Sequence, residues 1–454
     1  MPETGATALT APAGTTGVTG LLREIAGTGR DATRGGYSRP VYSSAESQLR
    51  EWFTDRARRT GLDTTTDRNG ILWAWWNPTG LPLEGAVVTG SHLDSVPGGG
   101  AFDGPLGVAS ALAAVSLLQA EGTTPRRPLA VAVFPEEEGS RFGVACLGSR
   151  LLTGALSPER ALGLTDADGD TLADVARRNG HDPAGLGRDE QALARIGDFV
   201  ELHVEQGRGL VDLGAPVALG SSILGHGRWR LSVSGQGNHA GTTAMDDRAD
   251  PVVAAGRIVV AVRDLARAVP GARGTVGRLV PVPGGTNVIA SRVDAWLDVR
   301  HADDAVTAAL VEEIRARAEV IAAEEGCRLD FGQESLSSTA RFDGPLTREL
   351  GRVLGDPPVL PTGAGHDAGV LAGHTRTAML FVRNPTGVSH SPQEAVEDAD
   401  AEAGTVALAD VLRHLLARPA PSAEPAGAGT VPDGVRAPRG GATVPVRREV
   451  GLHP

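Results

Sequence analysis

A short apolar run that leads into a glycine-rich polar loop constrains the fold of this chain most strongly. Residues 86–88 are Ala-Val-Val, and the chain continues as Thr-Gly-Ser-His-Leu-Asp over residues 89–94. A long apolar stretch starts soon afterwards, at Pro105. This order predicts a buried strand that delivers its C-terminal end to a loop, followed by a helix that packs on the sheet.

The loop carries a candidate for binding chemistry. His92 and Asp94 are two residues apart, so on an extended backbone their side chains share one face. Asp103 follows in the loop, among glycines that allow tight turns. A histidine and a carboxylate at a strand end, with a further carboxylate placed to hydrogen-bond the imidazole, are typical of a metal site. By itself the stretch fits a polar loop without a metal equally well.

The rest of the N-terminal half alternates between strand and helix patterns. Ser43 and Glu46 form a capping box, and apolar residues then recur at helical spacing. Further strands are predicted at 71–76, 84–90, 129–135 and 199–206, and a buried helix at 105–118. This alternation predicts an α/β fold with a mainly parallel sheet that helices cover on both faces.

A second module interrupts this pattern. Strands at 229–233 and 292–300 and helices at 250–269 and 302–325 predict a smaller α+β sandwich inserted into the first domain. The pattern returns with a strand at 377–382 and a helix at 401–417. We therefore expect the following organisation: a flexible N-terminus, 1–20; a catalytic domain, 21–218 plus 336–418; an inserted lid or dimerisation domain, 219–335; and a disordered tail, 419–454.

Composition excludes several classes of function. The formal net charge is -12, and all 43 basic residues are arginines, because the chain has no lysine. This excludes Schiff-base chemistry on a lysine of the protein, a phosphate-loop lysine and a lysine base. With no basic stripe, we expect no nucleic-acid partner, whereas a few arginines can hold a small anionic ligand.

Cysteine usage and hydropathy point to the compartment. The chain has two cysteines, Cys146 and Cys327, which excludes a disulfide framework and any cysteine-rich zinc or iron–sulfur site. The N-terminal residues show no basic region followed by an apolar one, and no apolar run approaches the ~18 residues of a membrane span. We expect a soluble, cytoplasmic protein without a membrane partner.

Three further clusters favour the metal interpretation. The strand at 129–135 runs into Glu136-Glu137-Glu138, His203 lies on an alternating strand, and His390 follows the last strand. Ligands of open α/β sheets bind at such carboxyl ends. Imidazole and carboxylate ligands without thiolate suit zinc, manganese or cobalt. Five protein ligands exceed what one catalytic zinc accommodates, so a carboxylate that bridges two metals resolves the count.

On these motifs the sequence resembles the di-metal amidohydrolases that include allantoate amidohydrolase, N-carbamoyl-L-amino-acid hydrolase and β-ureidopropionase. The resemblance covers about 43–417. Its motifs are Gly90-Ser91-His92-Leu93-Asp94-Ser95, Phe102-Asp103-Gly104, Glu137-Glu138-Gly139-Ser140-Arg141-Phe142, His203-Val204-Glu205-Gln206-Gly207, Asn238-His239-Ala240-Gly241 and His390-Ser391.

The resemblance implies a metal centre with two divalent ions (zinc, manganese or cobalt). It implies that His92 and His203 lie on different metals, that Asp103 bridges them, and that Glu138 and His390 complete the pair. Glu137 is then the general base, and Asp94 is counted with it as catalytic. If the register of the triplet slips by one, Glu136 becomes the base and Glu137 the ligand.

The resemblance also assigns substrate contacts. His239 and Asn287 match the donors to a substrate oxygen, and Arg300 matches the clamp on a substrate carboxylate. Gln206 and His366 match further substrate-binding positions. In the family the smaller domain mediates dimerisation, so the expected partners are a small carboxylate substrate and a second copy of the chain.

These features predict metal-dependent hydrolysis of a linear ureido or carbamoyl C–N bond. Allantoate amidohydrolase, which releases ammonia and carbon dioxide, is favoured; N-carbamoyl-L-amino-acid hydrolase and β-ureidopropionase are alternatives, and an aminoacylase or dipeptidase is more distant. A thiol amidase on Cys146 fits poorly, because its neighbours are apolar and no lysine is present. No G-x-S-x-G motif supports a serine hydrolase. A silent binding homologue should have lost a base or ligand, but every position is filled.

Overall fold

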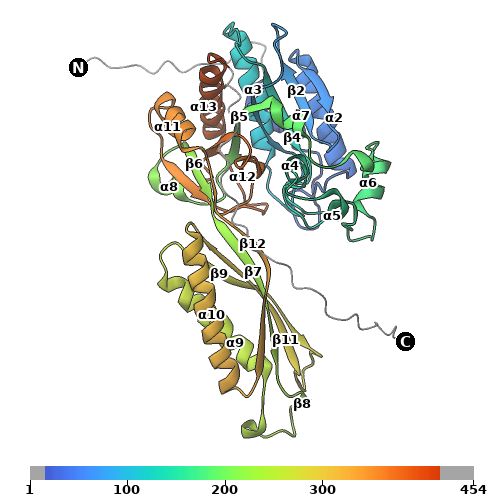
Figure 1. Cartoon of the computed structure of the whole chain (residues 1–454), viewed down its shortest axis with the longest axis vertical. Coiled ribbons are helices and arrows are strands. Elements are labelled where there is room, and N and C mark those ends of the chain that lie inside the picture. The colour runs from blue at the N-terminus through green and yellow to red at the C-terminus, as the bar shows by residue number, and fades with distance from the viewer. Residues whose placement is uncertain (1–15, 420–454) are drawn as a thin grey trace, which may run out of the picture. The chain divides into compact units, whose positions relative to one another are not determined.

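The computed structural model describes residues 16–419 and contains a large mixed sheet within them (Figure 1). Its strand order is β1-β2-β4-β3-β5-β15-β6-β13, and β14 also pairs with β6. The strands are β1 Asp63–Thr66, β2 Leu72–Trp76, β3 Ala86–His92, β4 Leu129–Phe134, β5 Ile196–Val204, β6 Val217–Ile223, β13 Ala340–Arg341, β14 Val359–Thr362 and β15 Arg376–Val382.

The centre of this sheet is parallel, as the sequence predicts. β3 pairs in parallel with β4 and β5, and β5 pairs in parallel with β15. Towards the edges the pairing becomes antiparallel, between β1 and β2, β2 and β4, and β15 and β6. The carboxyl ends of the central strands therefore meet at one edge, where His92 ends β3 and His203 lies one residue before the end of β5.

Local signals in the sequence set the helix starts. Ser43 caps α2, and its hydroxyl accepts a hydrogen bond from the Glu46 amide at 3.2 Å. Glu46 reaches back one residue further than a capping box requires, to the Tyr42 amide at 2.9 Å. The helices of this part are α1 Val18–Ile25, α2 Ser44–Arg59, α3 Pro105–Ala120, α4 Leu147–Thr153, α5 Pro158–Leu162, α6 Leu172–Arg178, α7 Glu190–Arg195, α8 Gly209–Leu213, α11 Gly344–Val353, α12 Asp367–Leu371 and α13 Asp398–Leu416, with a short 3-10 turn at Pro183–Gly185.

The N-terminal boundary predicted at residue 20 is wrong. Helix α1 already begins at Val18, and its Val18, Leu21 and Ile25 are buried. The threonine-, glycine- and alanine-rich composition before Leu21 concealed this apolar spacing of three and four residues. The predicted flexible residues 1–15 and the predicted tail from 420 onward lie outside the described residues.

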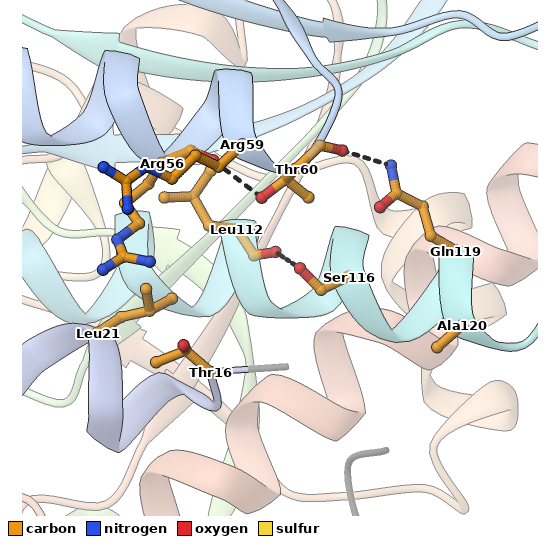
Figure 2. A pocket seen from close by; sticks show the side chains of 9 residues that line it. All are labelled: Thr16, Leu21, Arg56, Arg59, Thr60, Leu112, Ser116, Gln119 and Ala120. Carbon is orange, nitrogen blue, oxygen red and sulfur yellow. Dashed lines mark hydrogen bonds between the residues drawn. The ribbon is translucent and has the colours of Figure 1, made fainter. Parts of the chain in front are cut away.

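A cavity of about 470 Å³ lies where α1, α2 and α3 diverge (Figure 2). Its polar groups bond to the helices themselves: Gln119 donates to the Thr60 carbonyl, and Ser116 donates to the Leu112 carbonyl. Gln119 is fourteen residues beyond Pro105, which places it about 20 Å along α3 from the start of that helix. The cavity therefore runs along the second half of α3 and begins at Leu112, about 10 Å along the helix from Pro105.

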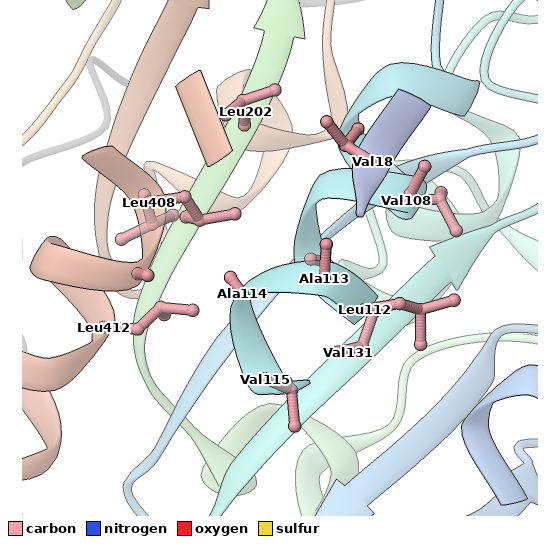
Figure 3. Packing of buried hydrophobic residues seen from close by; sticks show 14 of the residues in the cluster. Val18, Val108, Leu112, Ala113, Ala114, Val115, Val131, Leu202, Leu408 and Leu412 are labelled. Carbon is pink, nitrogen blue, oxygen red and sulfur yellow. The ribbon is translucent and has the colours of Figure 1, made fainter. Parts of the chain in front are cut away.

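Helices bury both faces of the large sheet. On one face α1, α2, α3 and α13 pack on strand residues such as Val131 and Leu202, and Figure 3 shows Leu112 and Leu408 within this layer. On the other face α4, α7 and α12 cover residues that include Trp73, Val88 and Phe199. Every residue of α3 from Pro105 to Val115 is buried, so this part of the helix fixes the position of the loop that precedes it.

The second module is a four-stranded antiparallel sheet, in the order β12-β7-β11-β9, with its own core. Its predicted limits, 219 and 335, lie inside β6 and β12, and the sheet itself runs from Gly225 to Ser337. Division of the chain into two domains at these limits stays a prediction. The elements are β7 Gly225–Ser234, β8 Asn238–His239, a 3-10 turn Met245–Asp247, α9 Pro251–Ala268, β9 Arg273–Val282, β10 Val288–Ile289, β11 Arg292–His301, α10 Asp304–Glu324 and β12 Arg328–Ser337.

Within residues 16–419, no helix combines the length and the apolar character that crossing a membrane requires.

Replacing Arg127 by Ala should lower the free energy of unfolding by ~3–5 kcal/mol, because it leaves a buried carboxylate without its main partner. Arg127 and Asp198 are both buried and lie 2.5 Å apart (Nη1 to Oδ2). Urea unfolding measures the change. Arg23→Ala is the control, because the pair of Arg23 with Asp398 is exposed and should contribute little. Equal stability of the two variants would contradict this prediction.

Candidate metal centre

Two histidines face one oxygen of Asp103. Nε2 of His92 lies 3.5 Å from Oδ1 of Asp103, and Nε2 of His203 lies 3.2 Å from the same oxygen. His92 comes from the end of β3, His203 from β5, and Asp103 from the loop before α3. All three side chains are buried, and their ligand atoms lie within 4.8 Å of one another.

A second group faces the other oxygen of the same carboxylate. Nε2 of His390 lies 3.5 Å from Oδ2 of Asp103 and 3.1 Å from Oε2 of Glu138. These three residues also place their ligand atoms within 4.8 Å of one another. Asp103 is therefore shared by two groups of possible metal ligands, one at each oxygen.

The geometry corrects one implication of the family resemblance. His92 and His203 were expected on different metals, but their Nε2 atoms approach the same Asp103 oxygen. Their rings stack with centroids 5.7 Å apart. Parallel pairing of β3 with β5 explains this, because it brings the carboxyl ends of the two strands side by side.

The buried histidines fit a cation. Nδ1 of His92 contacts the Asp94 carbonyl at 3.0 Å, and Nδ1 of His203 contacts the Val204 carbonyl at 2.9 Å. Since a carbonyl only accepts, each Nδ1 carries the hydrogen in the neutral ring, and each Nε2 presents a lone pair to Asp103. Among residues 16–419, neither Nε2 finds a hydrogen-bond donor. Two imidazole nitrogens that converge on one carboxylate oxygen can hold a cation between them, and a donor set of imidazole and carboxylate suits a metal ion.

The electrostatic field of the site favours positive charge. Burial alone would lower the pKa of His92, yet Glu137, Asp103 and Asp94 together raise it well above its usual value. Burial alone would raise the pKa of Asp103. Hydrogen bonds and charge from His203 and His92 outweigh it and hold this pKa well below its usual range. Asp103 is therefore held as a carboxylate.

The three glutamates after β4 point to different places. Glu136 is buried but turned away, and its carboxylate accepts from the amides of Arg141 at 2.9 Å and Phe142 at 2.6 Å. Oε2 of Glu137 lies 3.7 Å from Nε2 of His92, whereas Glu138 reaches His390. The backbone of Glu136 has a left-handed φ of 54°, which directs its side chain away from those of Glu137 and Glu138.

Asp94 contacts the glutamate segment. Its carboxylate accepts from the backbone amides of Glu137 at 3.2 Å and Glu138 at 3.1 Å. The expected bond to an imidazole is made by the Asp94 backbone carbonyl, and the carboxylate itself lies 3.6 Å from Nδ1 of His92. Asp94 thus orients both glutamates, a contact that spacing within 92–94 does not predict.

Two of the predicted substrate-binding residues lie within the ligand cluster. The Gln206 amide donates to Oδ2 of Asp103 at 2.8 Å and to the Ser389 hydroxyl at 3.0 Å. His366 is buried with its ring edge-on to His203, 4.4 Å between centroids. Burial, and then the charge of His203, lower the pKa of His366 well below its usual value, so this imidazole is neutral.

Arg300 lies on β11, at the border between the two sheets. Asp298 accepts from its Nε at 2.7 Å and its Nη2 at 3.0 Å, and the Gly363 carbonyl accepts from Nη1 at 2.6 Å. A guanidinium has five N–H donors, so within the described residues one remains on Nη1 and one on Nη2. Sequence reasoning missed Asp298, although its spacing of two from Arg300 on a strand was a sufficient signal.

His239 and Asn287 lie together but apart from this cluster. Both are exposed, β8 pairs His239 with Val288, and the Asn287 carbonyl accepts from the Ala240 amide at 3.0 Å. In the described part of the chain, neither side chain makes an ion pair or hydrogen bond with a predicted metal ligand. Their assignment as substrate donors stays a prediction.

The sequence of residues 88–414 matches the model of peptidase family M20/M25/M40. The chain belongs to this family. An N-carbamoyl-L-amino acid amidohydrolase of Geobacillus stearothermophilus is 36% identical over 399 residues, which cover 87% of this chain and 96% of that protein. Allantoate amidohydrolase of Escherichia coli is 32% identical, over 84% of this chain and 93% of its own length. The family match and these relatives together show that the chain is an enzyme of the amidohydrolase type.

Solved structures agree with this assignment. An amidase of the hydantoinase/carbamoylase family from Burkholderia multivorans superposes with a TM-score of 0.78 at 31% identity. The match covers 88% of this chain and 98% of the other. The family resemblance and the α/β fold predicted from the sequence are confirmed.

Gly104→Ala should disturb His92 directly. Gly104 has a φ of 84°, and a Cβ there would lie 2.5 Å from the His92 ring. Gly122→Ala is the matched control, with a φ of 72° and no atom within 4 Å of its Cβ, so only the backbone penalty of ~1–2 kcal/mol applies. Urea unfolding should show a larger loss for Gly104→Ala. Equal losses would mean that His92 moves aside freely.

Proposed function

We propose that this enzyme hydrolyses a linear C–N bond in the ureido or carbamoyl group of a small carboxylate substrate, with two divalent metal ions. The observation that carries the proposal is the position of Asp103, with one carboxylate oxygen facing His92 and His203 and the other facing Glu138 and His390. Relatives named for allantoate and for N-carbamoyl amino acids support the bond type.

Zinc, manganese or cobalt suits these ligands, and such ions supply an activated water and polarise the carbonyl to be attacked. In this proposal Glu137 is the general base. In the described part of the chain Glu137 makes no hydrogen bond to His390 or Asp103, its Oε2 lies 3.7 Å from Nε2 of His92, and it is buried. From there it can accept a proton from the attacking water and return it to the leaving nitrogen.

Arg300 is proposed to bind the substrate carboxylate. Its two remaining N–H groups, on Nη1 and Nη2, match the two oxygens of a carboxylate. Asp298 holds the guanidinium in the plane that this contact requires. Gln206, His366, His239 and Asn287 complete the proposed substrate-binding set.

Allantoate is the substrate we propose first, with release of ammonia and carbon dioxide. N-carbamoyl-L-amino acids are the second candidate, because a relative with that activity in its name is 36% identical. Ammonia release from allantoate, N-carbamoyl-alanine and N-carbamoyl-β-alanine, and alanine release from N-acetyl-alanine, decide between them when each metal is returned to stripped protein. Turnover of N-acetyl-alanine alone would contradict the proposal.

We also propose a homodimer formed through the second sheet and its helices. Val252, Val253 and Val260 on α9 are 43%, 45% and 48% exposed, and β9 is an edge strand. Exposed apolar side chains beside an unpaired strand edge favour association with a second copy. Sedimentation of the full chain measures this directly.

Asp103→Ala should lose both metals, because it removes the shared carboxylate. His92→Ala and His203→Ala should each lose one metal and keep the one bound by Glu138 and His390. Elemental analysis after equilibrium dialysis gives the stoichiometry. Two bound metals in Asp103→Ala protein would defeat the bridging assignment.

Glu137→Gln should bind metals and substrate normally while turnover falls by ~10²–10⁴, the usual worth of general acid–base catalysis. Glu138→Gln should instead weaken one metal and recover partly in excess metal. Glu136→Gln is the control and should leave turnover nearly unchanged. If Glu136→Gln is the inactive protein with full metal content, the register of base and ligand is shifted by one.

Arg300→Lys should raise KM for acidic substrates, because lysine keeps the charge but loses the planar pair of donors. Steady-state kinetics on a carboxylate substrate and on its amide separate this effect from general damage. The amide should be affected less. An unchanged kcat/KM for the carboxylate substrate would remove Arg300 from the site.

A further inference from the structure

Glu394 is a buried carboxylate that neither the sequence nor the proposed mechanism assigns. It lies four residues after His390, in the loop that follows β15, and is 6% exposed. Its Oε1 accepts from the backbone amide of Phe102 at 2.9 Å and from that of Asp103 at 3.0 Å. A residue nearly 300 positions away in the sequence thus holds the backbone of the Asp103 loop.

The contact is built into the shape of that loop. A Cβ at Gly100 would lie 2.2 Å from Oε1 of Glu394, so the loop passes against the carboxylate at a distance that only glycine allows. The Glu394 amide also bonds to the Ser391 carbonyl at 3.1 Å, which turns the side chain back towards Gly100. Glu394 therefore fills a fixed place beneath the loop.

The same segment also holds the Asp103 side chain. The Ser389 hydroxyl lies 3.1 Å from Oδ2 of Asp103 and 3.4 Å from Oε2 of Glu394. Its neighbour His390 approaches Oδ2 at 3.5 Å. One loop therefore supplies a ligand candidate, a hydroxyl on the shared carboxylate, and a clamp on the backbone beneath that carboxylate.

The carboxylates of Asp103 and Glu394 are both buried and both contact the Ser389 hydroxyl, so their mutual repulsion needs a compensating favourable interaction. The two amide bonds to Oε1 favour the ionised carboxylate and supply part of this compensation. They also fix the backbone of Asp103, which must present one oxygen to each ligand group. One side chain that contacts both the Asp103 backbone and the hydroxyl of Ser389, the residue before His390, ties the two ligand groups together.

We propose that Glu394 is a positioning residue that sets the placement of Asp103 relative to His390, and so the affinity of the site for its metals. This inference rests on the proposed two-metal function. Glu394 touches neither metal nor substrate in this proposal and acts through the Asp103 loop.

Calorimetric titration of metal-stripped full-length protein with manganese or zinc tests the proposal. Glu394→Ala should weaken metal binding by ~10–100-fold, the range typical of residues that support a ligand. Glu394→Asp keeps the charge but is one methylene short of the two amides, and it should resemble Glu394→Ala. Glu394→Gln keeps the length and an accepting oxygen, and it should lose only a few-fold. Activity at saturating metal should recover with an unchanged KM.

Glu397→Gln is the matched control, because Glu397 is exposed and its side chain makes no capping bond to α13. Wild-type affinity in Glu394→Asp and Glu394→Ala would overturn the inference and leave the proposed function intact. Absence of metal binding by the wild-type protein would instead defeat the proposed function. If Glu394→Ala does not fold, the metal affinities of the other two variants decide. The proposal requires weaker binding in Glu394→Asp than in Glu394→Gln, and equal affinities would count against it.

Discussion

The convergence of the buried His92 and His203 rings on one oxygen of the Asp103 carboxylate is the constraint on which the rest of the site depends. Backbone carbonyls fix the orientation of both rings, and both rings are buried, so they cannot turn away or be screened by water. Since a metal binds the neutral rings, a divalent ion at this place must displace the protons that the neighbouring carboxylates favour on His92 and His203. Strand pairing, the loop glycines and the helices behind them together hold this geometry.

The central sheet and the ligand residues were predictable because their signals are local. Continuous apolar runs mark β3 and β4, a period of two places Glu201 and His203 on one face of β5, and proline marks the start of α3. A parallel centre then brings the ends of these strands to one edge. The helix at Val18 was missed because small polar residues on both sides diluted its apolar spacing.

What the sequence could not predict depends on contacts between distant segments. Asp94 bonds to the backbone of Glu137 and Glu138, and Glu394 bonds to the backbone of the Asp103 loop. In each case a side-chain carboxylate accepts from a backbone amide. Since every residue except proline has such an amide, residue types alone do not indicate which one is bound. The assignment of His92 and His203 to one Asp103 oxygen likewise follows from which strands are adjacent, a property of the topology and not of spacing.

The burial of the first eleven residues of α3 has a consequence for how this enzyme can change. Asp103 lies just before this buried part of the helix, so the loop inherits its rigidity from the core. Substitutions in α3 that alter side-chain volume should therefore shift the ligand geometry even when they lie several turns away. Changes in substrate preference are therefore expected elsewhere, and the second sheet, which carries Arg300 close to the first, is where we expect substitutions to be tolerated.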